Sequence, residues 1–235
     1  TDSEKLAWFR VINIAGERLY EQELLNAVYC GPFVTDAKRY FSKRGCVAQK
    51  LGADYLEGKV ERQDYLATAL DWISNGCAEG YMATHQHDAN ATALWLHFNT
   101  VITWVKATFP TYRKEMKKVD WGNLYARFGE QTLDAKALEE KVARLMADSD
   151  VQKKAGIYAY VLDGDERNLN IRTFDDNTKR EVYERQKGIC AKCGKHFDIK
   201  EMEADHITPW SQGGHTVIDN CQMLCRDCNR RKSDK

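Results

Sequence analysis

The sequence is poor in helix breakers and has no long apolar run. Its 235 residues include only three prolines. No stretch reaches the ~18 consecutive apolar residues that a membrane-spanning helix needs, so we expect no membrane segment. The first residues, TDSEKLAWFR, also lack the apolar core of a secretory signal peptide. A membrane-embedded or exported protein is therefore not expected.

The sequence also lacks an excess of charge of either sign. It contains 35 basic and 35 acidic residues, which gives a formal net charge of zero. This balance gives no global electrostatic case for nucleic-acid binding and counts against a binder driven by charge alone. The composition is otherwise that of a folded soluble protein, with 43% hydrophobic and 30% charged residues, which argues against long disordered regions.

Cysteine is unevenly distributed. The chain has eight cysteines, and five of them lie at or after residue 190. A secreted disulfide scaffold would be shorter and more evenly studded with cysteine. Metal binding in a reducing compartment fits better, so we expect a cytoplasmic protein. The first three cysteines lie in helix-like stretches, where we expect them to be buried as small hydrophobic residues.

Two regions differ in their sequence pattern. Helical spacing of apolar residues predicts helices within residues 20–29, 36–58, 61–74, 90–109 and 133–150. From about residue 166 the pattern changes to a short strand-like piece at 171–174, a helix at 176–187 and a cysteine-rich, turn-rich end. We therefore predict an α+β protein with a mainly α-helical domain over residues 1–165 and a small second domain over residues 166–235.

Two C-x-x-C pairs stand in the second domain. Cys190 and Cys193 are separated by 31 residues from Cys225 and Cys228. Zinc binds four ligands in a tetrahedron, which two such pairs supply as thiolates. Four unligated thiols, or a redox-active C-x-x-C, are the weaker alternatives. With four sulfurs assigned, the zinc is structural, and His206 is not needed as a ligand.

The segment between the two pairs reads EADHITPWSQGGHTVIDNCQML. Its pattern predicts a strand at 203–207, a loop, and a second extended piece leading to Asn220. A helix that carries Asn229 and Lys232 then begins near Cys225. The predicted unit is a ββα fold stapled by zinc.

Over residues 171–235 this pattern resembles the four-cysteine subclass of HNH endonucleases, the ββα-metal nucleases. The resemblance implies that Asn220 braces the loop carrying His206, and that Asn229 stands where the third letter of the motif has histidine. The matching residues are the first C-x-x-C pair, Asp205, His206, Ile207, Pro209, Gly213, Gly214, Asn220, Leu224, Cys225, Cys228, Asn229 and Lys232.

The same residues suit phosphodiester hydrolysis, which needs a nucleophilic water and neutralisation of charge on the phosphate. Mg²⁺ or Mn²⁺ prefers oxygen ligands, so Asp205 and the side-chain carbonyl of Asn229 would anchor it. His206, with a pKa near neutrality, would act as the general base. Because neighbouring side chains on a strand point to opposite faces, the strand must bend for Asp205 and His206 to act together.

The final helix is basic. A solvated basic tail and a surface that binds DNA phosphates explain this pattern equally well. The residues expected to contact DNA in the second case are Arg226, Arg230, Arg231 and Lys232.

Residues 8–165 resemble the helical region that follows the ParB-like domain in bacterial restriction and phage-defence nucleases related to the GmrSD-type enzymes. The segment NIAGERLYEQELLNA and the later YMATH carry this resemblance. The Asp-Gly-Gln-Arg signature of the ParB-like domain is missing, so we expect a fragment or a shorter relative without nucleotide-dependent control. The expected partners are DNA and either a second copy of the chain or an N-terminal ParB-like domain.

The sequence is compatible with three functions. The first is a metal-dependent DNA endonuclease of bacterial restriction or phage defence. The second is a non-catalytic, zinc-stabilised module that binds DNA or protein. In the third, the helical domain is an interaction platform and the nuclease is a passenger. The intact set of Asp205, His206 and Asn229 favours the first, because a binding module does not need these groups.

Overall fold

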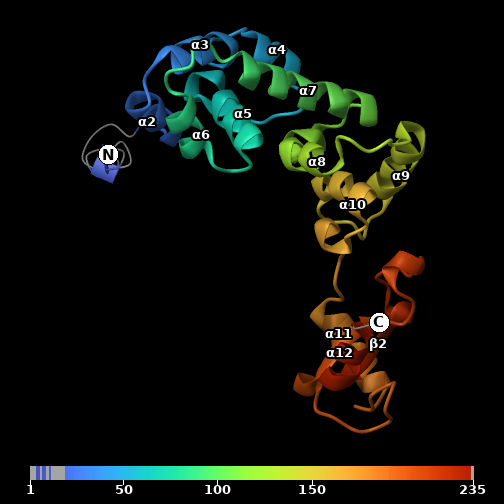
Figure 1. Ribbon diagram of the computed structural model, residues 1–235. Helices are drawn as coiled ribbons and strands as arrows, with labels where there is room; N and C mark the ends of the chain where they lie inside the picture. Colours follow the sequence, from blue (N-terminus) through green and yellow to red (C-terminus); the bar gives the residue numbers. More distant parts are fainter. Residues whose placement is uncertain (1–3, 6, 9–10, 12–18, 234–235) are drawn as a thin grey trace. The chain divides into compact units, whose positions relative to one another are not determined.

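The computed structural model describes residues 4–5, 7–8, 11 and 19–233, so part of the N-terminal segment behind the ParB-related resemblance, residues 9–10 and 12–18, lies outside the described residues. The chain forms two compact units (Figure 1). Unit 1 comprises Thr1–Leu145 and Lys154–Asp165, and unit 2 comprises Met146–Lys153 and Glu166–Lys235. Met146–Lys153, which the sequence assigned to the helical domain, thus packs with the C-terminal residues.

Unit 1 is built around α7, whose apolar residues are buried by neighbouring helices. Residues 94, 98, 101, 102 and 105 of α7 are all buried, with the spacing of one helix face. The helix ends before Phe109-Pro110, because a residue that precedes proline disfavours the helical conformation. The α-helices are α2 (Glu21–Val28), α3 (Pro32–Phe41), α4 (Val47–Gly52), α5 (Asp64–Ser74), α6 (Ala78–His85), α7 (Thr92–Thr108), α8 (Trp121–Phe128), α9 (Ala135–Ala147) and α10 (Ile157–Asp163), with 3-10 turns at Val60–Arg62, Lys114–Lys118 and Lys154–Gly156.

Aromatic rings fill the centre of unit 1. Trp72 of α5 stacks on Phe98 of α7 with ring centroids 5.5 Å apart. Phe41 of α3 meets the same ring edge-on at 5.3 Å. The approach of α8 to this cluster requires Gly122, because a Cβ atom there would lie 2.2 Å from Cδ1 of Trp72. A glycine contact therefore sets how closely α5 and α8 pack.

Unit 2 contains a two-stranded antiparallel sheet between helices. Its elements are η4 (Glu166–Leu169), α11 (Asp176–Arg185), η5 (Ile199–Glu201), β1 (Met202–His206), η6 (Trp210–Gln212), η7 (Ile218–Asn220), β2 (Cys221–Cys225) and α12 (Arg226–Ser233). With unit 1 mainly helical and this small sheet near the C-terminus, the predicted α+β class and the ββα order are confirmed.

Two local predictions were wrong. Residues 171–174 form no strand; Ile171 makes only an isolated bridge with Val151, while Phe174 is buried in the core. The second extended piece follows Asn220 instead of leading to it, because Ile218–Asn220 is a 3-10 turn and β2 begins at Cys221. The turn leaves the Asn220 side chain beside the loop and not in the ladder.

The register pairs five residues of β1 with five of β2. Met202 lies opposite Cys225, Asp205 opposite Gln222, and His206 opposite Cys221. The outer edge of β2 is satisfied by a side chain, because Gln186 donates to the Met223 carbonyl at 3.0 Å and accepts from the Met223 N–H at 2.8 Å. A glutamine amide thereby takes the place of a third strand.

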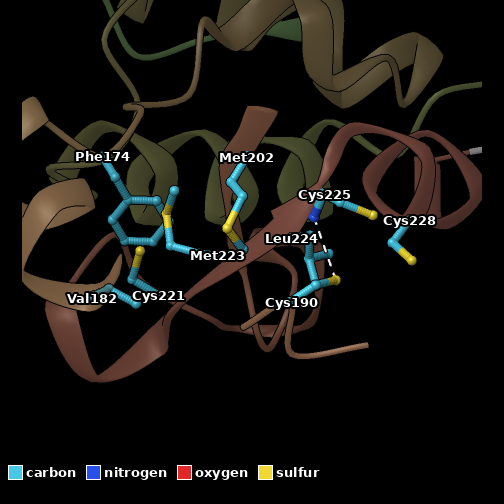
Figure 2. Packing of buried hydrophobic residues seen from close by; sticks show 9 residues of the cluster. All are labelled: Phe174, Val182, Cys190, Met202, Cys221, Met223, Leu224, Cys225 and Cys228. Carbon is cyan, nitrogen blue, oxygen red and sulfur yellow. Dashed lines mark hydrogen bonds between the residues drawn. The ribbon is translucent and has the colours of Figure 1, made fainter. Parts of the chain in front are cut away.

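The core of unit 2 consists largely of sulfur-containing residues (Figure 2). They are joined by Phe174, Val182 and Leu224 and comprise Cys190, Met202, Cys221, Met223, Cys225 and Cys228. In unit 1, by contrast, Cys30 and Cys77 are exposed and only Cys46 is buried, so the prediction that all three are buried was wrong for two of them. Among the described residues, no helix combines the length and apolarity needed to cross a membrane.

The contact between Gly122 and Trp72 predicts that Gly122→Ala destabilises unit 1. Overpacking of this kind costs about 1–3 kcal/mol, which should exceed the gain in helix propensity. Gly80→Ala is the matched control, because an added Cβ in α6 lies 2.8 Å from the Sγ atom of Cys77, an exposed side chain that can move aside. Thermal unfolding should show a lower midpoint for Gly122→Ala than for Gly80→Ala; equal midpoints would contradict the close packing.

Candidate active site and metal-binding cluster

The four predicted cysteines converge in unit 2. The sulfur atoms of Cys190, Cys193, Cys225 and Cys228 all lie within 4.8 Å of one another. The first pair precedes the sheet, while Cys225 ends β2 and Cys228 lies in the first turn of α12. The backbone N–H of Cys225 also donates to the Sγ atom of Cys190 at 3.3 Å (Figure 2). The cluster can hold one metal ion.

The thiols of this cluster differ in pKa. Burial alone would raise the pKa of Cys190, but backbone hydrogen bonds from Cys193, Cys225 and Lys192 lower it to about 6. The side-chain hydrogen bond with Cys225, together with burial, raises the pKa of Cys228 to about 12. Closely spaced sulfurs cannot all be anionic by themselves, so a thiophilic dication is needed to bind all four as thiolates.

Two clefts meet at Asp205 and His206. One, of about 590 Å³, is also lined by Arg172, Trp210 and Lys232. The other, of about 420 Å³, is lined by Glu203 and Asn229 as well. Although Asp205 and His206 are neighbours at the end of β1, both side chains border both clefts. Of the predicted catalytic residues, the structure thus brings Asp205, His206 and Asn229 to one cleft.

Asp205 is held from two sides. Across the sheet, Gln222 donates to the Oδ2 atom at 3.0 Å. From α12, the Nζ atom of Lys232 lies 2.5 Å from the same oxygen, and it also donates to the His206 carbonyl. The ammonium group of Lys232 therefore lies in the candidate site, between two oxygen atoms that attract a positive charge.

Asn229 is oriented by Glu203, which was not among the residues predicted to form the site. Its Nδ2 atom donates to Oε2 of Glu203 at 2.7 Å. Glu203 precedes Asp205 by two residues and so projects from the same face of β1. The period of the strand was the signal that could have identified it.

His206 is fixed by Thr216 and Phe174. Its Nε2 atom lies 3.0 Å from the Thr216 hydroxyl, and its ring centroid lies 4.5 Å from that of Phe174. Burial lowers the pKa of His206; Asp205 and Asp150 oppose this shift, and Lys232 adds to it. The net lowering favours the neutral imidazole, which is the form that accepts a proton.

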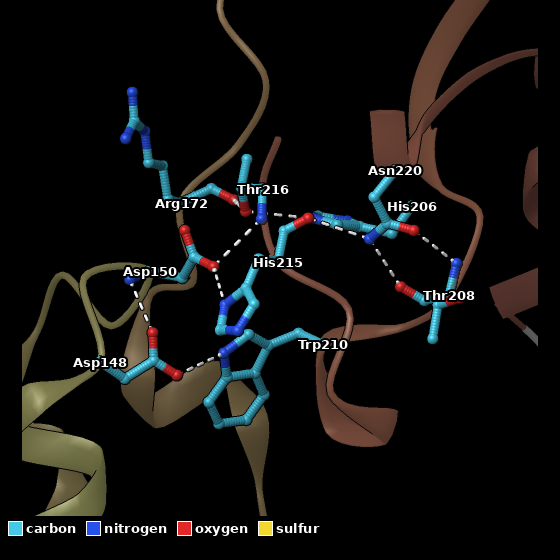
Figure 3. A network of polar contacts seen from close by, with 9 residues as sticks. All are labelled: Asp148, Asp150, Arg172, His206, Thr208, Trp210, His215, Thr216 and Asn220. Atoms are coloured by element: carbon cyan, nitrogen blue, oxygen red, sulfur yellow. Dashed lines mark hydrogen bonds and ion pairs between the residues drawn. The ribbon is translucent and has the colours of Figure 1, made fainter. Parts of the chain in front are cut away.

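Asn220 ties together the loop that follows His206. Its Nδ2 atom donates to the carbonyls of Thr208 and His215, and its Oδ1 atom accepts from the Thr208 N–H at 2.8 Å (Figure 3). The Asn220 carbonyl also accepts from the Ile207 N–H. Four hydrogen bonds to one residue thus close the loop between β1 and β2.

The segment Met146–Lys153 carries acidic residues into the same network (Figure 3). The Oδ2 atom of Asp150 accepts from the Thr216 N–H at 3.0 Å and contacts Nδ1 of His215 at 3.1 Å. Burial would raise the pKa of Asp150, but these hydrogen bonds outweigh it and lower that pKa. Asp148 accepts from the Trp210 indole at 3.0 Å. No sequence signal linked these aspartates to a site more than 50 residues away.

Asp148, Asp150 and His215 also bring potential metal-binding atoms within 4.8 Å of one another. Asp150 Oδ2 already makes contacts with both Thr216 and His215. We therefore interpret this cluster as a structural clasp between Met146–Lys153 and the loop.

The basic residues of α12 differ in orientation. Arg226, Arg230 and Arg231 are exposed, whereas Lys232 is partly buried against Asp205. The guanidinium group of Arg226 donates to the Lys200 carbonyl at 2.8 Å. The exposed surface of the helix thus keeps three of the four predicted cations.

The C-terminal part of the chain is similar in sequence to known proteins. Residues 190–235 match the family model described as HNH endonuclease. The type IV methyl-directed restriction enzyme EcoKMcrA of Escherichia coli is 35% identical over 71 residues, which cover 28% of this chain and 26% of that enzyme. The CRISPR-associated endonuclease Cas9 of Corynebacterium diphtheriae is 30% identical over 99 residues, 40% of this chain and 9% of that protein.

The chain thus spans about a quarter or less of the length of these relatives. No solved structure matches it significantly. The matched segment contains the four-cysteine cluster, both strands and α12. Residues 190–235 therefore carry a domain of the HNH endonuclease family.

Proposed function

We propose that this chain is a metal-dependent endonuclease that hydrolyses DNA phosphodiester bonds and acts in bacterial restriction or phage defence. The observation that carries the proposal is that Asp205, His206 and Asn229 border one cleft within the segment that matches the HNH endonucleases. The relatives support it, because one is a methyl-directed restriction enzyme and the other an endonuclease.

The four clustered cysteines would hold structural Zn²⁺. Four thiolates complete the usual zinc shell, so this ion would have no open position for a reactive water. The cluster joins the chain before β1 to the end of β2 and the start of α12. Its role is to fix the two strands and the helix that carry Asp205, His206 and Asn229.

The Asp205 carboxylate and the Asn229 side-chain oxygen would hold a second cation, Mg²⁺ or Mn²⁺. The cleft fits such an ion, because its donors are oxygens and because the Lys232 ammonium already lies against Asp205. When bound, the ion supplies charge neutralisation at the phosphate and at the leaving oxygen.

His206 takes the proton from the attacking water as the general base. Its partly buried ring, packed against Phe174, keeps a fixed direction toward the clefts. Asn220 holds the loop behind it. The exposed Arg226, Arg230 and Arg231 contact DNA phosphates, and Lys232 joins them once a bound cation takes its place beside Asp205.

Unit 1 positions DNA or regulates the nuclease that unit 2 forms. One HNH site cuts one strand, so a double-strand break requires two copies of the chain or two successive events. Instead of a second copy of the chain, the partner could be a ParB-like domain, as the resemblance of residues 8–165 to the restriction and phage-defence nucleases implies.

Plasmid nicking by the zinc-loaded protein with added Mg²⁺ or Mn²⁺ tests the proposal. His206→Ala should lower the nicking rate by about 10²- to 10⁴-fold, the usual contribution of a general base. His87→Ala is the control, because His87 is exposed in unit 1 and should leave nicking unchanged.

All three proteins must have equal zinc content and equal thermal midpoints, so that loss of fold is excluded. If His206→Ala nicks as fast as the wild type, His206 is not the base. If the wild type cuts neither plain nor methylated DNA, the zinc-stabilised binding module becomes the better description.

Zinc content tests the structural site separately. The wild type should carry one zinc per chain, and Cys225→Ser should lose it and unfold at a lower temperature, because zinc binding in such small domains supplies folding free energy. Cys221→Ala is the matched control, since Cys221 lies in the same strand but outside the four-cysteine cluster. Full zinc occupancy in Cys225→Ser, measured by elemental analysis, would contradict the assignment.

A further inference from the structure

We propose that Thr216 is a positioning residue that holds the His206 imidazole with its proton on Nε2, so that Nδ1 is the basic nitrogen, and that Asp150 holds Thr216 in place. The catalytic consequence rests on the proposed nuclease function, whereas the assignment of the ring proton does not. Thr216 and Asp150 are joined to His206 by hydrogen bonds (Figure 3).

The hydroxyl group of Thr216 has one proton to donate and two neighbours. Its Oγ1 atom lies 3.1 Å from the backbone carbonyl of Arg172 and 3.0 Å from Nε2 of His206. A carbonyl oxygen can only accept, so the contact with Arg172 is a hydrogen bond only if Thr216 donates. The hydroxyl proton is then used, and Oγ1 can only accept from His206. Nε2 must therefore carry the ring proton.

The position of the lone pair follows from the chemistry of imidazole. A neutral ring carries one N–H, so a proton fixed on Nε2 leaves the lone pair on Nδ1. His206 borders both clefts, and its Nε2 side faces Thr216. The nitrogen that can accept a proton from water is therefore Nδ1.

Asp150 holds Thr216 in place. Asp150 acts through two groups: its carboxylate accepts from the Thr216 N–H at 3.0 Å, and its backbone carbonyl accepts from the Arg172 N–H at 2.8 Å. It thereby fixes the backbone of both Thr216, which carries the hydroxyl, and Arg172, whose carbonyl receives the hydroxyl proton. Asp150 is only 3% exposed, so its position is set by the surrounding packing.

This arrangement lies partly outside the segment that matches the HNH family model. Thr216 is within residues 190–235, whereas Arg172 and Asp150 precede them. Met146–Lys153 packs with unit 2 although it is followed by a segment that belongs to unit 1. By packing with unit 2, Met146–Lys153 brings Asp150 to Thr216 and so helps to orient the histidine of the candidate site.

The test compares Thr216→Val, which removes the hydroxyl at nearly constant shape, with Thr216→Ser, which keeps it. Thr178→Val in α11 is the control, because it makes the same chemical change at a hydroxyl that bonds to Asp175. The full-length, zinc-loaded chain is used throughout. Nuclear magnetic resonance of the ¹⁵N-labelled histidine rings, with His206 assigned by loss of its signals in His206→Gln, reads the ring proton directly.

The expected result is a wild-type His206 with a proton on Nε2 that exchanges slowly with water. Thr216→Ser and Thr178→Val should retain this signal, and Thr216→Val should lose it through fast exchange. In nicking assays kcat should fall about 10- to 100-fold in Thr216→Val with an unchanged KM, as for other residues that orient a functional histidine, and Thr216→Ser should restore it.

Two results would overturn the inference: a wild-type ring with its proton on Nδ1, or a Thr216→Val ring signal equal to that of the wild type. The first needs no variant, so it decides the question even if Thr216→Val fails to fold. A wild type that cuts no DNA would refute the proposed function, and the ring signals would still decide the role of Thr216.

Discussion

The register of β1 against β2 is the constraint on which the rest of unit 2 depends. Successive strand residues face opposite sides, so a slip by one residue would exchange every side chain between the faces. In the observed register, Asp205 lies opposite Gln222, which donates to it, and Met202 lies opposite Cys225 of the sulfur cluster. The ladder therefore links a metal-binding cluster at one end with the candidate site at the other.

An isolated pair of strands is at best marginally stable in water, so this register needs support from outside the ladder. Gln186 satisfies the free edge of β2 at Met223, and Asn220 closes the loop between the strands. The core beneath is small and rich in cysteine and methionine (Figure 2). A unit of roughly 80 residues with such a core typically needs a metal or a covalent staple. The four converging cysteines can bind such a metal.

The candidate site is assembled from segments that are distant in the sequence. Asp205 and His206 come from β1, and Asn229 and Lys232 from α12. Their supporting contacts involve Asp150, more than 50 residues earlier. These segments also act together on the pKa of His206. Burial lowers that pKa, and the carboxylates of Asp205 and Asp150 oppose the shift. The segment that matches the HNH family therefore contains the candidate catalytic residues, and Asp150 and Arg172, which precede it, contact Thr216 beside His206.

The sequence by itself determined whatever depends on local spacing. The two C-x-x-C pairs were sufficient to predict the four-cysteine cluster. The segment around the Asp-His pair and the amphipathic patterns were sufficient to predict the ββα order and most helices. They sufficed because these features depend on neighbouring residues and on the periods of helix and strand. The ParB-related resemblance and the roles in catalysis stay predictions.

Only the tertiary structure decided which distant groups meet. It placed Met146–Lys153 with unit 2, began β2 after Asn220, buried Phe174 where a strand was predicted, and turned Lys232 toward Asp205. It also brought Glu203 to Asn229 and Thr216 to His206. These contacts follow from packing and from the satisfaction of buried polar groups, and neither has a period that can be read along the chain.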